Sequence, residues 1–323
     1  MFFMMSKKWL FFIFLIFSLV SFSQTYDSYK PERDKIHDLV HTKLKVDFNF
    51  NKKELNGEAW VTAKPHFYAT DHFSLDAKAM IIHQVSFNNE ILEYSYDDYK
   101  INIDLPKEFR KGEEFTIYIK YTARPEKVAQ KGSAAITSAK GLYFINADGY
   151  DKNKPTQIWT QGETEASSCW FPTIDTPNQK TTQEIYITVP KRFVTLSNGK
   201  LVDQVVNGSN RTDYWKMDKK HAPYLFFMGV GEYEIIKDSY NNIPIDYYVE
   251  KKYAPYAKDI FGNTPEMMEF FSRILGVAFP WNKYSQIVGR EYVSGAMENT
   301  TDVIHGEQAY QNPGKLLDEN IKE

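Results

Sequence analysis

The sequence predicts a mainly β protein, in which a large antiparallel sandwich-like domain is followed by the start of an α+β domain. Apolar and polar residues alternate repeatedly between about Leu44 and Val230, Gly-containing turn pairs separate the alternating segments, and one clear helical pattern comes only after the alternation ends. Hydrophobic residues make up 42% and charged residues 25% of the 323-residue chain, which is typical of a folded globular protein.

Residues 1–23 have the pattern of a secretory signal peptide. Lysines precede an apolar run over 9–20, and Ser-Phe-Ser at 21–23 supplies small residues before a cut at Gln24. The run is shorter than the roughly 20 residues that a spanning helix needs. We therefore expect an exported protein, periplasmic or extracellular, with no transmembrane segment after signal cleavage.

Alternation with a period of two predicts strands that each have one buried face. The clearest such segments are residues 44–50, 101–105, 115–121 and 185–189. Turns are predicted at 55–57, 111–112, 197–199 and 207–208, where Gly tolerates a positive φ. Because no ten-residue helical pattern interrupts this region, we assign residues 24–235 to one antiparallel β domain.

The pattern changes after about Tyr233. Two strand-like stretches, 233–236 and 243–249, precede a helix for which Thr264 is the predicted N-cap and Gly276 the end. Its apolar stripe consists of Met267, Phe270, Phe271, Ile274 and Leu275. The change of period predicts a second, mixed domain that begins at 236 and continues to 323.

Charge and cysteine content exclude two kinds of site. The chain has 39 basic and 42 acidic side chains, a formal net charge of −3, so no basic excess exists to neutralise phosphates and a nucleic-acid partner is not expected. The single cysteine, Cys169, excludes an intramolecular disulfide and a zinc site built from several thiolates. We expect Cys169 to be a small buried residue.

Two short blocks carry chemistry. Residues 295–299 read Gly-Ala-Met-Glu-Asn, which by itself is also typical of a strand edge with a glycine bulge. Residues 159–163 read Trp-Thr-Gln-Gly-Glu, and an aromatic-Pro-x-x-Asp-x-Pro turn follows at 171–177. In this order the blocks resemble the zinc aminopeptidase family typified by aminopeptidase N (the gluzincins), whose exopeptidase signature is Gly-Ala-Met-Glu-Asn. The resemblance covers about residues 36–323.

The resemblance implies a fold and an activity. The first domain would be the family's saddle-like β domain, and residues 236–323 would begin a thermolysin-like catalytic domain. The family removes N-terminal residues from peptides by the attack of a metal-activated water, so the implied partners are peptides with a free N-terminus.

By resemblance, Glu298 is the principal anchor of the substrate's α-ammonium group and Glu163 is the second anchor, with Gln161 in a nearby wall. A closed pocket lined by carboxylates rejects internal peptide segments, because an internal amide brings no cation to offset the desolvation of those carboxylates. Each charge-assisted hydrogen bond in such a pocket contributes roughly 1.5–3 kcal/mol.

The remaining motif residues would shape the binding strand. By resemblance, Gly295 and Ala296 present backbone groups to a substrate that adds as a strand, since a small side chain permits close approach. Ser294 would line the pocket for the first substrate side chain. Met297 and Asn299 complete the substrate-binding motif.

The catalytic half of the family site is not expected in this chain. The resemblance implies one zinc ion in the full-length enzyme, held by His-Glu-x-x-His and a more distant Glu, with the motif's own Glu as general base and a downstream Tyr. No such motif occurs between Asn299 and Glu323. His37 and His41 have the spacing of a ligand pair on a helix, but alternation predicts a strand from Thr42 onward, and Asp38 between them is one methylene shorter than the Glu that acts as base. We therefore predict no zinc ligand, no catalytic residue and no hydrolysis by this chain alone.

Three hypotheses about function remain open. The first is that the chain is the front portion of an exported zinc aminopeptidase, cut short by a gene boundary. The second is a non-catalytic β module that grips peptide N-termini without cleaving them. The third is a general sugar- or protein-binding β-sandwich, which would be favoured if replacing Glu298 left peptide binding unchanged.

Overall fold

The computed structural model describes residues 33–129 and 131–310. The described residues from Ile36 onward belong to one compact unit. The predicted signal peptide lies outside the described residues. Within the two described ranges, no helix is both long enough and apolar enough to cross a bilayer.

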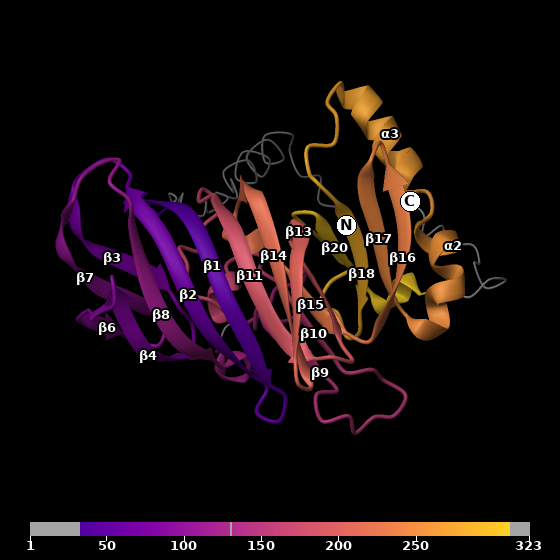
Figure 1. The fold of residues 1–323 in the computed structure, drawn as a ribbon, viewed down its shortest axis with the longest axis horizontal. Coiled ribbons are helices and arrows are strands. Elements are labelled where there is room, and N and C mark those ends of the chain that lie inside the picture. The colour runs from indigo at the N-terminus through magenta and orange to yellow at the C-terminus, as the bar shows by residue number, and fades with distance from the viewer. Residues whose placement is uncertain (1–32, 130, 311–323) are drawn as a thin grey trace, which may run out of the picture. The chain divides into compact units, whose positions relative to one another are not determined.

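The largest sheet has eight strands in the order β13-β14-β11-β1-β2-β8-β4-β5 (Figure 1). In chain order they are β1 (His37–Asn49), β2 (Glu54–Pro65), β4 (Met80–Phe87), β5 (Glu90–Ile91), β8 (Phe115–Ala123), β11 (Thr181–Pro190), β13 (Lys200–Asn207) and β14 (Asn210–His221). The predicted alternation is confirmed in β1, where Leu44 and Val46 are buried and Lys45 is exposed.

The prediction of purely antiparallel pairing is wrong at one place in this sheet. β1 and β11 run parallel, with Leu44 opposite Ile185. Alternation specifies which face of a strand is buried but not the direction of its neighbour. The chain between β1 and β11 forms other strands before it returns, and this long connection allows the parallel pair.

Three smaller sheets complete the β structure. One has the order β3-β7-β6, with β3 (Thr70–Asp76), β6 (Tyr94–Tyr96) and β7 (Lys100–Phe109). A second has the order β12-β15-β10-β9, with β9 (Leu142–Ile145), β10 (Gln157–Thr160), β12 (Val194–Ser197) and β15 (Met228–Gly231). The third is mixed, in the order β16-β17-β18-β20-β19, with β16 (Tyr233–Tyr240), β17 (Ile243–Glu250), β18 (Tyr284–Gly289), β19 (Ala296–Asn299) and β20 (Asp302–Gly306).

The described helices are short apart from one. The α-helices are α2 (Ala257–Phe261) and α3 (Thr264–Leu275), and the 3-10 helices are η1 (Pro125–Lys127), η2 (Ser167–Cys169), η3 (Pro223–Leu225), η4 (Lys251–Tyr256) and η5 (Glu307–Ala309). The structure is therefore mainly β, as predicted.

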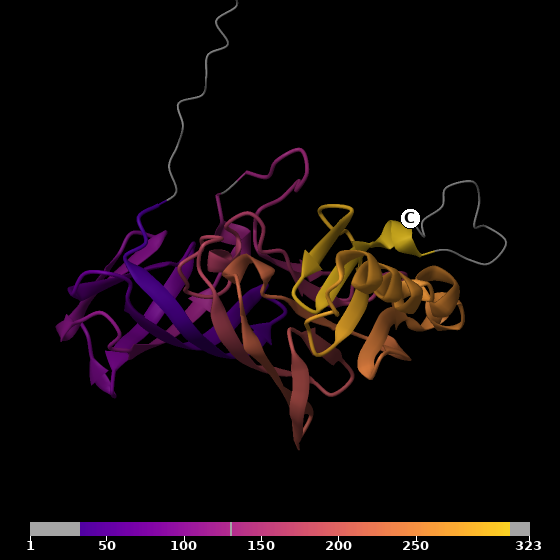
Figure 2. The same cartoon turned by 90° about the horizontal axis from the view of Figure 1, so that it is seen from above.

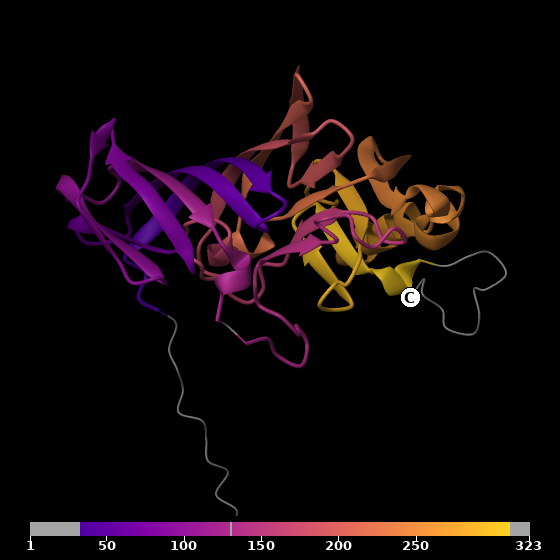
Figure 3. The same ribbon diagram turned by 90° about the horizontal axis from the view of Figure 1, so that it is seen from below.

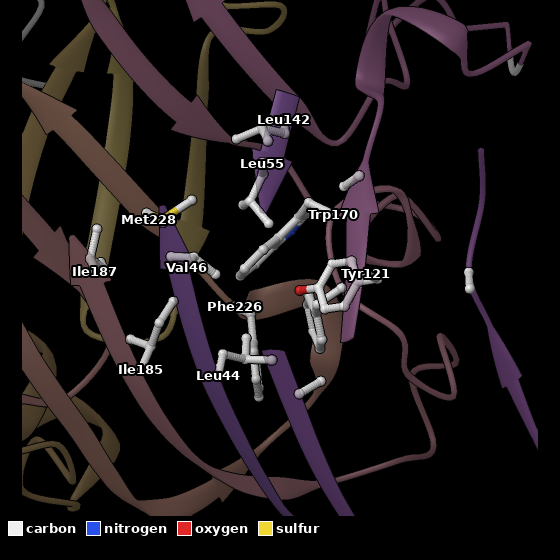
Figure 4. Packing of buried hydrophobic residues seen from close by; sticks show 14 of the residues in the cluster. Leu44, Val46, Leu55, Tyr121, Leu142, Trp170, Ile185, Ile187, Phe226 and Met228 are labelled. Atoms are coloured by element: carbon white, nitrogen blue, oxygen red, sulfur yellow. The ribbon is translucent and has the colours of Figure 1, made fainter. Parts of the chain in front are cut away.

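One apolar cluster joins the large sheet to the four-stranded sheet. Figure 4 shows Leu44, Ile185 and Leu142 among its side chains, and Trp170 and Phe226 lie between the strands. All five side chains are buried. The inward positions of the alternating strands supply this cluster, so the packing follows directly from the period of two.

The predicted turn at 55–57 is wrong. Gly57 lies inside β2, directly opposite Tyr121 of β8, and a Cβ atom on Gly57 would overlap the Tyr121 ring. Glycine is therefore required there because the aromatic ring lies across the strand. The other glycine turns are confirmed, since Gly112, Gly199 and Gly208 all have positive φ.

Helix α3 begins one residue away from the predicted cap. Asn263 occupies the N-cap position, and the Thr264 hydroxyl lies 2.7 Å from the Phe261 carbonyl oxygen and 2.7 Å from Gln286 Oε1. Thr264 therefore joins the helix to β18, and its prediction as the N-cap is wrong. Gly276 ends the helix with φ 65°, as predicted.

Most of the apolar stripe of α3 is exposed. The exposed fractions of Phe270, Phe271, Ile274 and Leu275 are 44, 56, 62 and 69%. Met268, which is not in the predicted stripe, is buried in the cluster under the five-stranded sheet. The period of 3.6 predicted the helix correctly, but the helix packs against the described residues through a different side.

Candidate functional site

Strand β10 positions the first block of the candidate site. It lies between β15 and β9, and all four of its residues are buried. Trp159 stacks on Tyr143 with ring centroids 4.1 Å apart. Where the strand ends, the Gln161 backbone N–H donates to the Gly141 carbonyl at 2.9 Å. Gln161 is consequently buried, and Glu163, two residues further on, is only partly covered.

Strand β19 positions the second block at the edge of the five-stranded sheet. It pairs with β20 on one side, with Ala296 opposite His305. Alternation leaves Ala296 and Glu298 exposed and buries Met297 and Asn299. Glu298 is therefore directed away from the core by the same pattern that inserts Met297 into it.

The two blocks are held together through the backbone of Arg290. Gln157 Oε1 accepts from the Arg290 N–H at 2.9 Å, and Trp159 Nε1 donates to the Arg290 carbonyl at 3.1 Å. The Arg290 guanidinium binds both oxygens of Glu250 at 2.5 and 2.9 Å and Glu307 at 2.5 Å. These contacts fix the segment that leads from β18 to β19 against β10.

Tyr292, which follows in that segment, lies at the centre of the site. Its hydroxyl donates to Gln161 Oε1 at 2.5 Å, and its ring meets Trp159 edge to face at 5.2 Å. Burial raises the pKa of the Tyr292 phenol well above its ordinary value, and negative charge on neighbouring groups, including Glu163 and Glu298, raises it further. The Tyr292 phenol therefore contacts Gln161 directly and lies within the electrostatic influence of Glu163 and Glu298.

The loop that follows β8 borders the site. Thr137 donates to the Val293 carbonyl from its backbone N–H at 3.1 Å and from its hydroxyl at 3.2 Å. Figures 2 and 3 both show this magenta loop beside the yellow strands β19 and β20. The segment 291–294 is thus contacted from the β10 side and from the loop side.

The remaining motif residues differ in their surroundings. Ser294 is partly covered, and Gly295 is exposed with open space where a Cβ atom would lie. The Gly295 carbonyl accepts from the Gly306 N–H at 2.9 Å and from Gln308 Nε2 at 3.0 Å. Within the part of the chain that the structure describes, neither polar atom of the buried Asn299 amide has a hydrogen-bond partner.

Sequence reasoning missed Tyr292, Gln157 and Arg290 as members of this site. Tyr292 stands close to the Gly-Ala-Met-Glu-Asn block, but an aromatic residue beside a strand is typical of core packing as well. The contacts of Gln157 and Tyr292 join residues more than 130 positions apart. A local pattern contains no information about such pairs.

The two histidines with ligand spacing do not meet. Both lie in β1, where a bulge between Leu39 and His41 turns their side chains to opposite faces. His37 is buried between the rings of Phe73 and Phe115, and His41 Nδ1 lies 2.8 Å from Thr182 Oγ1. The two imidazoles therefore do not face a common point.

Two further residues have structural surroundings. Cys169 is buried, and burial raises the pKa of its thiol to about 12, which disfavours the nucleophilic thiolate. Asp175 is also buried, and its Oδ2 accepts from the Ser168 N–H at 2.8 Å. Asp175 thus fixes the 3-10 helix η2, which precedes it.

A zinc ion, which the resemblance implies, needs several ligating side chains around one point. Across residues 33–129 and 131–310, no group of three or more His, Cys, Asp or Glu side chains is placed to hold a metal ion. The described residues therefore do not fit zinc, and none of them is given a role in metal chemistry.

Comparison with known proteins agrees with the fold. A solved M1 zinc metallopeptidase from Deinococcus radiodurans superposes with a TM-score of 0.70 at 16% identity, covering 86% of this chain and 62% of that chain. The puromycin-sensitive aminopeptidase of Caenorhabditis elegans is 25% identical over 287 residues, or 84% of this chain and 28% of the relative. Transcription initiation factor TFIID subunit 2 of Danio rerio is 24% identical over 203 residues, or 60% of this chain and 16% of the relative.

The chain thus spans less than a third of the length of either curated relative. A family model, that of the Peptidase M1 N-terminal domain, matches residues 26–225, which is more than half of the chain. The protein belongs to the Peptidase M1 N-terminal domain family and is a distant homologue of the M1 aminopeptidases over most of its length.

Proposed function

We propose that this chain recognises the free N-terminus of peptides, as the amine-binding part of an exported zinc-dependent aminopeptidase. One observation carries the proposal: Tyr292, in the segment that leads to β19 and Glu298, donates to Gln161 just after β10, and the charges of Glu163 and Glu298 both act on the Tyr292 phenol.

Two carboxylates suit a terminal ammonium group. An ammonium ion donates up to three charge-assisted hydrogen bonds, each worth roughly 1.5–3 kcal/mol, and its charge offsets the repulsion between the two acids. An acetylated terminus supplies neither the charge nor the donors, so the carboxylates would be desolvated without compensation. The position of β19 at a sheet edge supports a peptide that adds as a further strand.

We further propose that residues 24–235 form the family's saddle-like domain and that residues 236–323 begin a thermolysin-like catalytic domain. The mixed five-stranded sheet with α3 begins with β16 at Tyr233 and supports a division close to residue 235, because its parallel pairs differ from the mostly antiparallel sheets before it. In this proposal the zinc ligands and the general base of a full enzyme belong to sequence other than the described residues.

The amine-recognition proposal is tested by titration calorimetry with a tripeptide that has either a free or an acetylated N-terminus. The protein should bind the free peptide at least tenfold more tightly. Glu298→Gln should remove most of this preference, because it removes a charge that pairs with the ammonium, and Glu163→Gln should weaken it. Glu165→Gln is the matched control, since Glu165 is an exposed acid in the same loop. Equal affinity for the two peptides would refute the proposal, and an unchanged Glu298→Gln variant would favour a general binding sandwich.

The second candidate function is a non-catalytic module that binds N-termini. It is favoured by the similarity to TFIID subunit 2, whose name describes a transcription factor subunit and not a peptidase. Zinc content and turnover of an aminoacyl reporter distinguish the candidates for this chain. We expect peptide binding without turnover, and stoichiometric zinc with turnover would contradict that expectation.

Export is proposed from residues 1–23 and has its own test. Expression of the whole chain in a bacterial host followed by N-terminal sequencing of the envelope fraction should give a mature protein that begins at Gln24. A product that retains residues 1–23 in the cytoplasm would contradict the proposed export to the periplasm or the medium.

A further inference from the structure

We infer that Tyr292 is a positioning residue, whose hydroxyl holds the Gln161 side chain so that its amide nitrogen faces an incoming peptide carbonyl. The inference rests on the proposed function and extends it, because it assigns a role to a residue outside the recognised blocks. It also gives Gln161 a different part from that of the two anchors: it would bind the peptide's carbonyl oxygen and not its ammonium.

The direction of the Tyr292–Gln161 hydrogen bond is the first step. A neutral phenol has one proton to donate, and the 2.5 Å contact is made to the amide oxygen of Gln161. Burial and the neighbouring carboxylates keep the phenol protonated, since both raise its pKa. With the amide oxygen bound to Tyr292, the Gln161 NH₂ group lies in the same plane on the other branch of the carboxamide and points away from the phenol.

The amide nitrogen of Gln161 is buried and lacks an acceptor among the described residues. Gln161 is 1% exposed, and among the described residues its Nε2 has no hydrogen-bond partner. A buried N–H group without an acceptor costs about 1–3 kcal/mol, so an acceptor supplied by a ligand would recover that free energy. In the proposed function, the carboxylates accept hydrogen bonds from the terminal ammonium group of the peptide. The acceptor that a peptide offers next along its chain is the carbonyl oxygen of its first residue.

Tyr292 is held in place by contacts on both sides of its segment. Its ring is braced by Trp159, and the preceding Arg290 backbone is bonded on both its N–H and its carbonyl by Gln157 and Trp159. On the other side, Thr137 holds the Val293 carbonyl. A phenol fixed at so many points can select one of the two orientations of the Gln161 amide.

The experiment compares Tyr292→Phe with Tyr233→Phe. Phenylalanine keeps the ring packing in both variants and removes one buried hydroxyl, which in Tyr233 donates to the Val288 carbonyl at 3.1 Å. Titration with the free-amine tripeptide should show Tyr292→Phe weakened about five- to tenfold and Tyr233→Phe unchanged. In a Gln161→Met background, Tyr292→Phe should have no further effect, because the group through which it acts is absent.

Two outcomes overturn the inference while leaving the proposed function intact: wild-type affinity in Tyr292→Phe, or an equal loss with and without Gln161. If the wild-type protein shows no preference for a free amine, the proposed function fails, and the role at Gln161 is read by NMR instead. With ¹⁵N-glutamine labelling, the Gln161 side-chain NH₂ signals should shift and exchange faster in Tyr292→Phe and stay unchanged in Tyr233→Phe. Unaltered signals in Tyr292→Phe overturn the positioning role in that case as well.

Discussion

At the scale of single residues, two glycines that look alike in the sequence have opposite surroundings. Gly57 faces the Tyr121 ring across the strand pair, whereas Gly295 has nothing within 4 Å of the place where a Cβ atom would lie. Both have backbone conformations without a positive φ. The difference between them is therefore one of space alone.

We expect Gly57→Ala to lower the free energy of unfolding by about 1–3 kcal/mol, because a methyl group forced against a buried ring displaces it. Gly295→Ala should leave the melting temperature within about 1 °C of the wild type. Thermal unfolding of both variants measures the contrast. A Gly57→Ala variant as stable as Gly295→Ala would show that the Tyr121 ring can move aside.

The residue scale also shows what the sequence can and cannot reveal about the site. Glu163 and Glu298 were predicted because each belongs to a short block with a recognisable order of residues. Tyr292 was not, because its importance comes from a contact with Gln161 131 positions away. Contacts of that kind follow from the register of strands in different sheets, and no local pattern specifies such a register.

At the scale of elements, periodicity predicted the strands and the helix well and their neighbours poorly. β7, β8 and β11 lie where alternation placed them. The parallel pairing of β1 with β11 and the side on which α3 packs were not predictable, since a period defines an apolar face but not what covers it. The same limit applies to β13, whose residues are all exposed although Leu201, Val202, Val205 and Val206 are apolar.

The exposed side of α3 gives a prediction at this scale. Replacing both Phe271 and Leu275 with Gln should reduce the fluorescence of the dye ANS bound to the protein, because these exposed side chains are part of an apolar surface. The melting temperature should change little. Met268→Ala, which truncates a buried side chain on the same helix, should instead cost about 2–4 kcal/mol. If the double Gln variant unfolds as easily as Met268→Ala, the exposed side of α3 is a packed one in solution.

At the scale of the whole molecule, buried histidines and a buried aspartate change the folding stability in opposite directions as the pH falls. Burial lowers the pKa of His37 to about 4, of His221 to about 3 and of His305 to about 4. Below pH 6.5 the unfolded chain binds protons at these positions and the folded chain does not, so stability falls on acidification. Burial raises the pKa of Asp175 to about 7, so between pH 7 and 4 the folded chain binds the extra proton and stability rises.

We therefore expect Asp175→Asn to make the protein more sensitive to acid. Asparagine keeps an acceptor for the Ser168 N–H but removes the compensating proton, a difference on the order of 4 kcal/mol at about 1.4 kcal/mol per unit of pKa. Melting temperatures measured from pH 7 to pH 4 should fall more steeply in the variant than in the wild type. Asp203→Asn, at an exposed position in β13, is the control that should leave the slope unchanged. A variant with the wild-type slope would mean that Asp175 is already ionised in the folded protein at pH 4.

The Arg290 backbone joins β10 to the five-stranded sheet, and this contact couples ligand binding to the stability of the folded chain. Glu163 follows β10, and Glu298 lies in β19 of the five-stranded sheet, so a chain in which the five-stranded sheet separates from β10 would keep most of its strands and lose the site. Any molecule that binds both carboxylates then binds only the joined state. It stabilises that state by RT ln(1 + [L]/Kd), about 2.7 kcal/mol at a hundredfold excess over Kd. A bound peptide would thus also stabilise the contact between β10 and the five-stranded sheet.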